Sequence, residues 1–561
     1  MKFSNCKKLI FLAGVFLSLL AGSVSATSVG DTVSFNVDKS FDISARTQLS
    51  ATLIKTSSKL YFYIDKIWWE AQTTIRQNQI LSNLDNLSSE FDANIYPRLT
   101  SSFGSEWSPG IDGDSKITIL LEPMNSAEGG YFREADEYEK IQMPVSNERE
   151  MLYLAVSSID NQNAKVVLAH EFTHLITFNQ KNKIYGVEEE TWLNEARADY
   201  SSTILGYDDN YEGSNLQQRV KDFVENSSDS ITDWTGTKYD YASVSLFMHY
   251  LVDHYGINIL NNSLKSRAVG TESINQALLS GGFQQNFSQI FTDWTIALVV
   301  NDCSQNSKYC YTNQNLKNLR INPALIFLPL SGDSSLSSTS TTKNWTGNWQ
   351  KIIGGNGSLK LNFSNSSGLN FQVPYIAYDK NNNYSVKFLT FDQDKKGEIS
   401  IADFGTKYNA VIIIPSLQVN FPVVDGAGVT YRYSFTVSIA GNNPIAPDQS
   451  VIQKLLAQID SLKKQIAIIL AQKQGGATTP GASCQITGNL YYGMYSNSNV
   501  RCLQLFLKTQ GSSMYSGLVT GYFGPLTKSA VIKFQTKYSL STTGNVDEPT
   551  RIKINQMLNG G

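Results

Sequence analysis

Two histidines and a glutamate stand in the pattern H-E-x-x-H at residues 170 to 174, and this pattern suits metal chemistry. On a helix, residues four positions apart lie on one face, so the imidazoles of His170 and His174 can bind one metal ion from the same side. Glu171 lies beside them, near enough to polarise a water molecule at that ion. The surrounding apolar residues predict a largely buried helix. The pattern alone leaves open a plain buried helix whose two histidines are only hydrogen-bonded.

A second segment, residues 192 to 200, supplies the ligand that H-E-x-x-H lacks. Glu195 follows His174 by 21 residues, and Asp199 stands one helical turn after Glu195. Catalytic zinc usually takes three protein ligands and keeps a fourth position open for water. A ligating histidine usually donates its other ring N–H to a carboxylate, which is the role expected of Asp199. We therefore predict Zn²⁺ as the cofactor, held by His170, His174 and Glu195.

Together these residues resemble the signature of the gluzincin metallopeptidases, which is H-E-x-x-H followed by N-E-x-x-[AS]-D. The matching residues are His170, Glu171, His174, Asn194, Glu195, Ala198 and Asp199. Within that clan, W-L-N-E-A and the GGYF at 129 to 132 are most similar to the hyicolysin-type peptidases. The resemblance implies an α+β zincin-like domain with endopeptidase activity. The metzincin alternative fails, because Gln180 stands where that family needs a third histidine.

The resemblance also implies roles for other residues. Glu171 would take the proton of the attacking water and deliver it to the leaving amine. A tyrosine near the predicted helix at 239 to 256 would stabilise the oxyanion, and Tyr241 is the candidate. The stretch 129 to 138 is expected to supply either a strand that binds extended substrate or a lid over it. The remaining histidines, His249 and His254, are predicted near the surface of their helix.

The N-terminus predicts export. Lysines and an apolar run are followed by Val24-Ser25-Ala26, which fits a cleavage site, so residues 1 to 26 are predicted to be a secretory signal peptide. An extracellular or wall-associated location follows. In an exported chain, the four later cysteines predict two local disulfides. These are Cys303–Cys310 and Cys484–Cys502.

The whole chain has 561 residues, which is too long for a single core and predicts several domains. With 41% hydrophobic and 17% charged residues, the composition is that of globular proteins. The net charge of −3 gives no reason to expect a nucleic acid partner. The predicted boundaries are 1–26 signal peptide, 27–330 zinc metallopeptidase domain, 331–343 Ser/Thr-rich linker, 344–442 all-β sandwich, 450–473 amphipathic helix, 474–483 linker and 484–561 C-terminal unit.

Residues 452 to 469 carry isoleucine and leucine at alternating spacings of three and four. Such a seam can form a short parallel coiled coil and hence a weak dimer. A helix that docks on its own chain, or a stiff spacer, explains the pattern equally well.

The C-terminal unit contains an internal repeat. Gly521 to Thr527 reads G-x-x-x-x-x-T, and Gly544 to Thr550 repeats it, each before a helix-like segment. With V-x-x-L-Q-x-x-L from Val500 to Leu507, the unit resembles the three-helical peptidoglycan-binding-like domain. That resemblance implies cell wall or peptidoglycan as a partner.

The sequence thus predicts a secreted zinc endopeptidase that acts on proteins or peptides and is tethered to the cell wall. Two alternatives remain open. In one, the zinc site is vestigial and the chain is a surface or wall-binding protein. In the other, the enzyme cleaves the peptide stems of peptidoglycan.

Overall fold

The computed structural model describes residues 28 to 558, except 126–128, 161–162, 331, 420–427, 442–484, 495–497, 512–513, 516 and 518. The chain divides into two compact units, Met1–Ala446 and Pro447–Gly561. The predicted signal peptide, the predicted coiled coil and the linker at 474 to 483 lie outside the described residues. Within the described part of the chain, no helix is long and apolar enough to cross a membrane.

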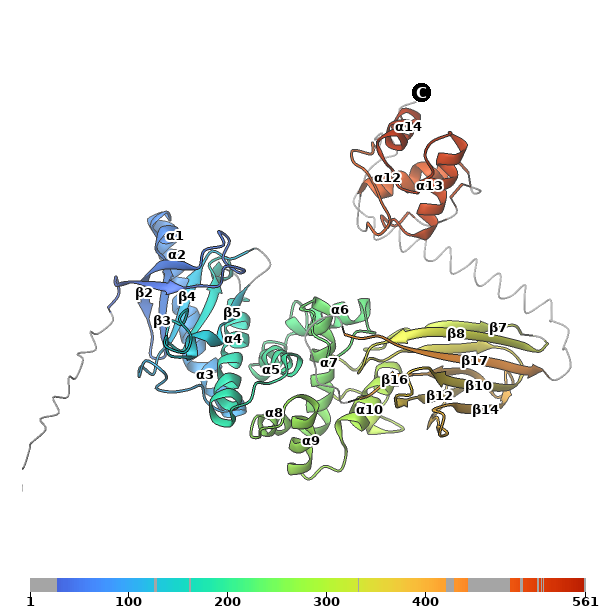
Figure 1. Ribbon diagram of the computed structural model, residues 1–561, viewed down its shortest axis with the longest axis horizontal. Helices are drawn as coiled ribbons and strands as arrows, with labels where there is room; N and C mark the ends of the chain where they lie inside the picture. Colours follow the sequence, from blue (N-terminus) through green and yellow to red (C-terminus); the bar gives the residue numbers. More distant parts are fainter. Residues whose placement is uncertain are drawn as a thin grey trace, which may run out of the picture. The chain divides into compact units, whose positions relative to one another are not determined.

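A six-stranded sheet begins the first unit (Figure 1). Its strands, in spatial order, are β1 (Thr32–Asn36), β2 (Gln48–Thr56), β3 (Leu60–Asp65), β4 (Ile117–Glu122), β6 (Met151–Ala155) and β5 (Gly130–Phe132). The central strands β3, β4 and β6 run parallel, whereas β5 pairs antiparallel with β6 at the edge. Every residue of β4 and β6 is buried, as expected for apolar strands that are covered on both faces.

Helices before β4 cover one face of this sheet. They are α1 (Lys66–Glu70), α2 (Thr74–Glu90), a π-helical turn (Phe91–Ile95) and α3 (Tyr96–Phe103). Pro97 lies in the first turn of α3. Proline is tolerated there because first-turn N–H groups need no helical acceptor.

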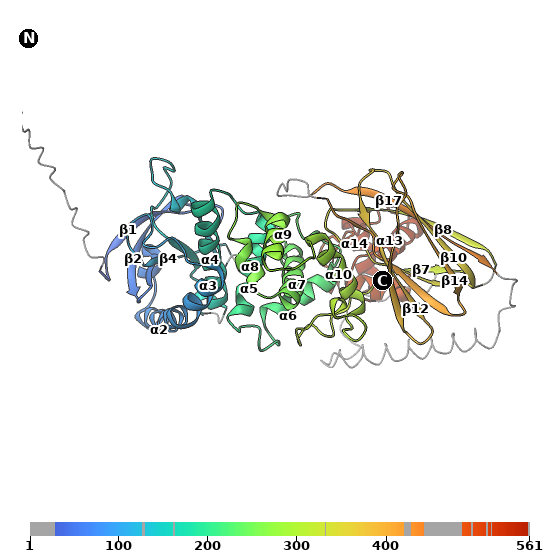
Figure 2. The ribbon, with the colours of Figure 1, turned by 90° about the horizontal axis from the view of Figure 1, so that it is seen from below.

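A layer of helices completes the part of the unit before the second sheet. It contains α4 (Ala164–Phe178), a π-helical turn (Asn179–Lys183), α5 (Thr191–Ile204), α6 (Asn215–Glu225), α7 (Lys238–Tyr255), α8 (Asn258–Ser263), α9 (Gly270–Ser280) and α10 (Phe287–Val300). Helix α4 packs against β6 and β5 on one side and against α5 on the other. Figures 1 and 2 both show α4 and α5 side by side. Two helices that follow one another along the chain therefore face each other.

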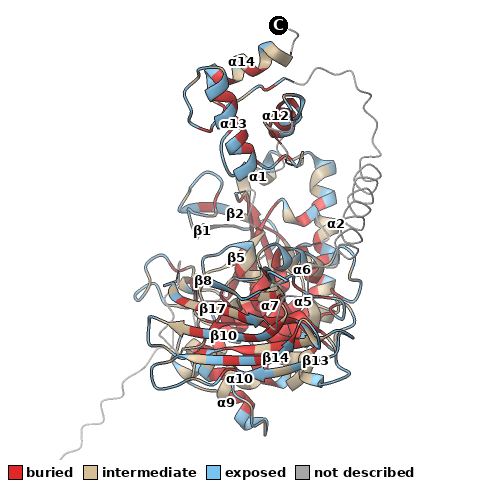
Figure 3. Ribbon diagram, turned by 90° about the vertical axis from the view of Figure 1, so that its right-hand side faces the viewer, coloured by how far each residue is buried: buried red, intermediate tan, exposed pale blue. Residues whose placement is uncertain are grey.

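One large mixed sheet follows, with nine strands wrapped into a nearly closed arrangement around one core. The strands are β7 (Ala324–Leu328), β8 (Ser334–Thr342), β9 (Gln350–Gly354), β10 (Gly357–Asn365), β12 (Pro374–Asp379), β13 (Tyr384–Phe388), β14 (Gly397–Phe404), β15 (Tyr408–Ile413) and β17 (Tyr431–Gly441), beside a small pair, β11 (Phe371–Gln372) and β16 (Ser416–Leu417). The prediction of an all-β region is right in class, but most strands belong to one continuous sheet instead of two facing sheets. Alternate residues of β10 are buried, as Figure 3 shows.

The predicted linker at 331 to 343 is wrong over most of its length. Residues 334 to 342 form β8, which pairs along its length with β17. Hydroxyl groups pair across the two strands, with Ser337 and Thr436 2.8 Å apart and Thr339 and Ser434 2.9 Å apart. A solvent-facing edge strand can be built from serine and threonine, so its composition matches that of a linker. The sheet therefore begins before residue 344, with β7 and β8.

This sheet shares a core with the helical layer. The Trp345 ring packs against Phe287 and Phe291 of α10, with ring centroids 4.8 and 5.4 Å apart. The indole N–H of Trp349 donates to the carbonyl oxygen of Thr295, 2.9 Å away. The all-β region is thus packed onto the part of the chain that carries the predicted zinc ligands.

The second unit has three helices in its described residues, α12 (Ser498–Thr509), α13 (Pro525–Lys537) and α14 (Glu548–Leu558), around its own core. The repeat seen in the sequence has a physical basis. Gln504 on α12 accepts from the backbone N–H of Gly521 and donates to the Thr527 hydroxyl. Gln535 on α13 makes the same two bonds, to Gly544 and Thr550. Each glutamine fixes the loop that leads into the next helix.

Candidate metal centre

The three predicted zinc ligands converge. The Nε2 atoms of His170 and His174 lie 3.1 Å apart. Glu195 approaches both, with one carboxylate oxygen 3.2 Å from His170 Nε2 and the other 3.6 Å from His174 Nε2. Among the described residues, this is the one group of three or more histidine, cysteine or carboxylate side chains whose donor atoms come within 4.8 Å of one another.

The two helices explain the convergence. His170 and His174 lie one turn apart on α4, whose apolar residues are buried between the sheet and α5. Glu195 lies on α5, which packs beside α4. Burial lowers the pKa of His170, but Glu195 and the charge of Glu171 outweigh burial and raise that pKa to about 9. Burial raises the pKa of Glu195, yet the two histidines leave it below its ordinary value. The site therefore favours a positive charge among these groups.

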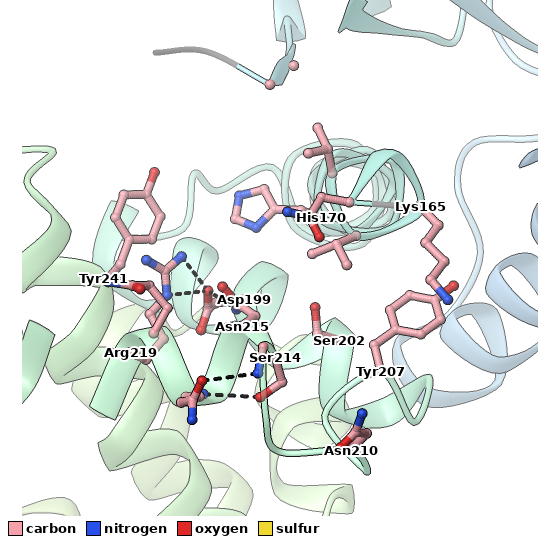
Figure 4. A pocket seen from close by; sticks show the side chains of 18 of the residues that line it. Lys165, His170, Asp199, Ser202, Tyr207, Asn210, Ser214, Asn215, Arg219 and Tyr241 are labelled. Atoms are coloured by element: carbon pink, nitrogen blue, oxygen red, sulfur yellow. Dashed lines mark hydrogen bonds and ion pairs between the residues drawn. The ribbon is translucent and has the colours of Figure 1, made fainter. Parts of the chain in front are cut away.

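A cleft of 670 Å³ opens beside these ligands. His170, Glu171, Asp199, Arg219 and Tyr241 all contribute to its lining, and Figure 4 shows the ring of Tyr241 beside that of His170. Glu171 comes from the same helix as both histidines and is mostly buried. The cleft thus brings a carboxylate and a phenol to the predicted zinc site.

Arg219 and Asn215 bind the carboxylate of Asp199. Its Oδ1 accepts from Arg219 Nε at 2.9 Å and Nη2 at 2.7 Å, and from Asn215 Nδ2 at 2.9 Å. Its other oxygen is buried, and its negative charge contributes to raising the pKa of His170. Within the described residues, no hydrogen bond joins Asp199 to either histidine. Its predicted role towards a ligating histidine stays a prediction.

Tyr241 lies at the N-terminal end of α7, where Thr237 and Asp240 form a capping box. Its ring centroid lies 6.4 Å from that of His170, and the Trp234 ring packs edge-on against it at 4.8 Å. Burial, with the charges of Glu195 and Glu171, raises the pKa of Tyr241. The hydroxyl therefore keeps its proton at neutral pH and can act as a hydrogen-bond donor.

Two residues near the site were given no role by the sequence. Arg219, on α6, bonds Asp199 and places its guanidinium carbon 4.8 Å from the centroid of the Tyr241 ring. Burial lowers the pKa of His174, and a hydrogen bond with the Asn194 side chain partly opposes this shift. Asn194 stands in the N-E-x-x-A-D match, so the sequence did carry a signal for it. The sequence carries no such signal for Arg219, because Arg219 lies outside the motif, on α6, and meets Asp199 of α5 only in the folded chain.

The other two histidines lie away from the predicted ligands. His249 is 2% exposed, contrary to the expected surface position, and its Nε2 lies 3.3 Å from the Thr203 hydroxyl. His254 Nε2 lies 2.9 Å from the carbonyl oxygen of Cys310. The predicted Cys303–Cys310 disulfide is confirmed. Cys502 is also disulfide-bonded, and its predicted partner Cys484 lies outside the described residues.

The stretch at 129 to 138 begins as a strand. Strand β5 pairs with β6 on one side and ends the sheet in the described part of the chain. A Cβ atom at Gly130 would lie 2.6 Å from the Tyr153 carbonyl oxygen and 2.9 Å from the Val167 side chain of α4. One at Gly129 would also lie 2.9 Å from Val167. Glycine is therefore required for β5 to lie this close to α4, and both glycines line the cleft.

Comparison with known proteins identifies the C-terminal unit. Residues 496–554 match the family described as "Putative peptidoglycan binding domain". The sequence prediction of a peptidoglycan-binding-like domain is thereby confirmed for this segment. No curated protein sequence matches the chain. The resemblance to gluzincin peptidases stays a prediction.

Similarities to solved structures cover about a fifth of the chain. One is the pre-peptidase C-terminal domain of a collagenase from Bacillus anthracis, at 9% identity over 21% of this chain and 96% of that chain, with a TM-score of 0.14. Another is the mitogen from Yersinia pseudotuberculosis, at 11% identity over 20% and 92%, with a TM-score of 0.15. A third is PliG, a periplasmic inhibitor of g-type lysozyme from Aeromonas hydrophila, at 10% identity over 21% and 98%, with a TM-score of 0.13. Identity and TM-score are too low for these similarities to bear on function.

Proposed function

We propose that this protein is a zinc-dependent endopeptidase that hydrolyses peptide bonds in proteins or peptides and is tethered to the cell wall by its C-terminal unit. The observation that carries the proposal is the convergence of His170, His174 and Glu195 beside a cleft that Glu171 also lines. Two imidazole nitrogens and one carboxylate oxygen are a donor set that suits zinc and leaves one coordination position open.

The spacing of the donor atoms supports zinc. Ligands at about 2.0–2.1 Å around a tetrahedral zinc ion stand about 3.3 Å from one another. The three donor separations here are 3.1, 3.2 and 3.6 Å. Without a proton or a cation between them, such close imidazole nitrogens and carboxylate oxygens would repel one another, since each presents a lone pair.

The residues of the cleft have complementary tasks. A divalent cation bound here would polarise a carbonyl group and lower the pKa of water towards neutrality. Glu171 accepts the proton of the attacking water on its carboxylate and delivers it to the leaving nitrogen. Tyr241, protonated at neutral pH, donates a hydrogen bond to the substrate oxygen that gains negative charge. Arg219 holds Asp199 and the Tyr241 ring in place.

Strand β5 supports an extended peptide as the substrate. Its outer edge is unpaired in the described part of the chain, and its Gly130, with the preceding Gly129, lines the cleft. A peptide segment laid along that edge can form main-chain hydrogen bonds, as in other cases of strand addition. Of the two expectations for residues 129 to 138, the substrate-binding strand is the one that we adopt.

The test uses the mature chain and Glu171→Gln. We expect the wild-type protein to bind one zinc ion and to cleave an unfolded protein substrate, and a chelator to abolish cleavage. Glu171→Gln should keep zinc and lose about 10²–10⁴-fold in kcat. Glu212→Gln is the matched control, because Glu212 lines the same cleft but is not part of the ligand group.

The alternatives give different results. If the zinc-loaded wild-type protein cleaves neither proteins nor purified peptidoglycan, the site is vestigial and the peptidase proposal is wrong. If it releases stem peptides from peptidoglycan and leaves proteins intact, the substrate class changes and the metal chemistry stands.

A further inference from the structure

The C-terminal unit contains two matching loops, residues 521 to 527, which Gln504 holds, and residues 544 to 550, which Gln535 holds. In both, the glycine, the third residue and the threonine are buried, and the second residue is exposed. The third residues are Phe523 and Val546, which share the core. The second residue is Tyr522 in one loop and Asn545 in the other. Since asparagine serves the fold equally well at this position, folding does not account for a tyrosine that is 44% exposed.

A second exposed tyrosine lies beside the first. The backbone N–H of Gly493 donates to the Phe523 carbonyl oxygen at 3.0 Å, and the N–H of Phe523 donates to the Met494 carbonyl oxygen at 2.7 Å. These bonds hold the loop that carries Tyr492, which is 50% exposed, against the loop that carries Tyr522. A hydrogen bond between the two side chains raises the pKa of Tyr522.

Lys528 adds a positive charge at the border of this pair. Its Nζ lies 5.7 Å from the centroid of the Tyr492 ring. Its aliphatic stem is close to Gly544, where a Cβ atom would lie 3.0 Å from Lys528 Cγ. Residues 485 to 558 hold seven lysine and arginine residues and two acidic ones, whereas the whole chain has a net charge of −3. Positive charge is therefore concentrated in the unit that carries the two tyrosines.

We propose that Tyr492 and Tyr522, bordered by Lys528, form the surface on which the C-terminal unit binds the glycan strands of peptidoglycan. This rests on the wall-binding part of the proposed function. Tyrosine offers a rigid apolar ring at low entropic cost, and its hydroxyl can hydrogen-bond sugar hydroxyl and acetamide groups. The rings contact the C–H faces of the N-acetylated sugars, and Lys528 attracts the carboxylates that the same polymer carries.

The test is co-sedimentation of the full chain with purified peptidoglycan. The protein carries Glu171→Gln throughout, so that no cleavage alters the polymer. Added to this background, Tyr492→Asn and Tyr522→Asn should each weaken binding about tenfold, which corresponds to about 1.4 kcal/mol. Tyr522→Asn copies the residue of the second loop and so preserves the fold. Asn545→Ala, at the matching position of that loop, is the control and should bind as before. Equal thermal unfolding of all variants verifies folding.

The outcomes separate this inference from the tether on which it rests. If the Glu171→Gln protein does not sediment with peptidoglycan, the wall tether is wrong and this inference falls with it. If that protein binds and both tyrosine variants bind equally well, the tether stands and the tyrosine surface is wrong. A soluble tetramer of N-acetylglucosamine should compete for binding. Competition by stem peptides alone would assign the surface to the peptide and overturn the glycan proposal.

Discussion

Arg219 holds Asp199 by two hydrogen bonds to a single carboxylate oxygen, 2.9 Å from Nε and 2.7 Å from Nη2. The same guanidinium covers the ring of Tyr241, with 4.8 Å between its central carbon and the ring centroid. One side chain on α6 thus links the carboxylate behind the predicted ligands to the phenol in the cleft. Burial lowers the pKa of Arg219, but Asp199 more than compensates, so the pair stays ionised.

Arg219→Lys should therefore lower activity although it keeps the charge. Lysine cannot make both bonds to Asp199 and cover the ring at once. We expect kcat to fall about 10- to 100-fold, with weaker zinc binding. Steady-state kinetics and a zinc titration measure the two effects. Lys221→Arg, on the same helix and the same cleft, should change neither by more than about twofold. Unchanged kcat in Arg219→Lys would remove Arg219 from the catalytic arrangement.

His174→Ala should lose the metal. Its Nε2 is one of three donors, and a site left with one imidazole and one carboxylate binds zinc far more weakly. Elemental analysis after dialysis should show about one zinc per wild-type chain and almost none in the variant. His254→Ala is the control, because His254 lies at the Cys310 carbonyl. Full zinc content in His174→Ala would exclude it as a ligand.

Glu122 should make stability depend on pH. Burial raises the pKa of this carboxyl group to about 7, although a hydrogen bond from Tyr131 opposes the shift. The unfolded chain ionises Glu122 near its ordinary pKa of 4.5, so the folded state holds its proton more tightly between the two values. Stability from this group is therefore greatest at low pH and is lost as pH rises from about 4.5 to about 7.

Glu122→Gln keeps an acceptor for Tyr131 and cannot ionise. Relative to wild type, the free energy of unfolding of the variant should rise over that pH window by at most about 3 kcal/mol, and stay level above it. Urea denaturation at several pH values measures the difference. A difference that does not change between pH 4.5 and pH 7 would show that folding leaves the pKa of Glu122 unshifted.

Trp345→Ala should destabilise the cleft from a distance. The indole fills the shared core next to Phe287 and Phe291, and losing a buried tryptophan typically costs about 3–5 kcal/mol. We expect zinc-site and β-region unfolding to shift together to lower denaturant concentration. Leu336→Ala on β8, where the leucine is exposed, is the control and should cost less than about 0.5 kcal/mol. Separate transitions for the two regions would contradict a shared core.

Sequence reasoning succeeded where geometry is local. Two histidines four residues apart on an apolar helix have to share a face. The N-E-x-x-A-D match predicted that Glu195 joins them. It failed where the partner is remote. The Ser/Thr-rich composition of β8 is that of a linker. It forms a strand because β17, roughly a hundred residues later, supplies its hydrogen bonds. His249 was expected at a surface that other helices cover. Arg219 meets Asp199 only because α6 folds back on α5.

Gly129 and Gly130, at the start of β5, leave the sheet side of the cleft with main chain and little side chain, because larger residues would collide with α4. Main-chain groups would contact a peptide in the same manner whatever its amino-acid sequence. In the proposed peptidase, discrimination between one amino-acid sequence and another would have to arise on the facing side, where α6 and the loop before it present Asn210, Gln217 and Gln218. Altered preference in the proposed peptidase is therefore to be sought in that polar stretch, whereas changes at Gly129 or Gly130 would impair the binding of all peptides alike.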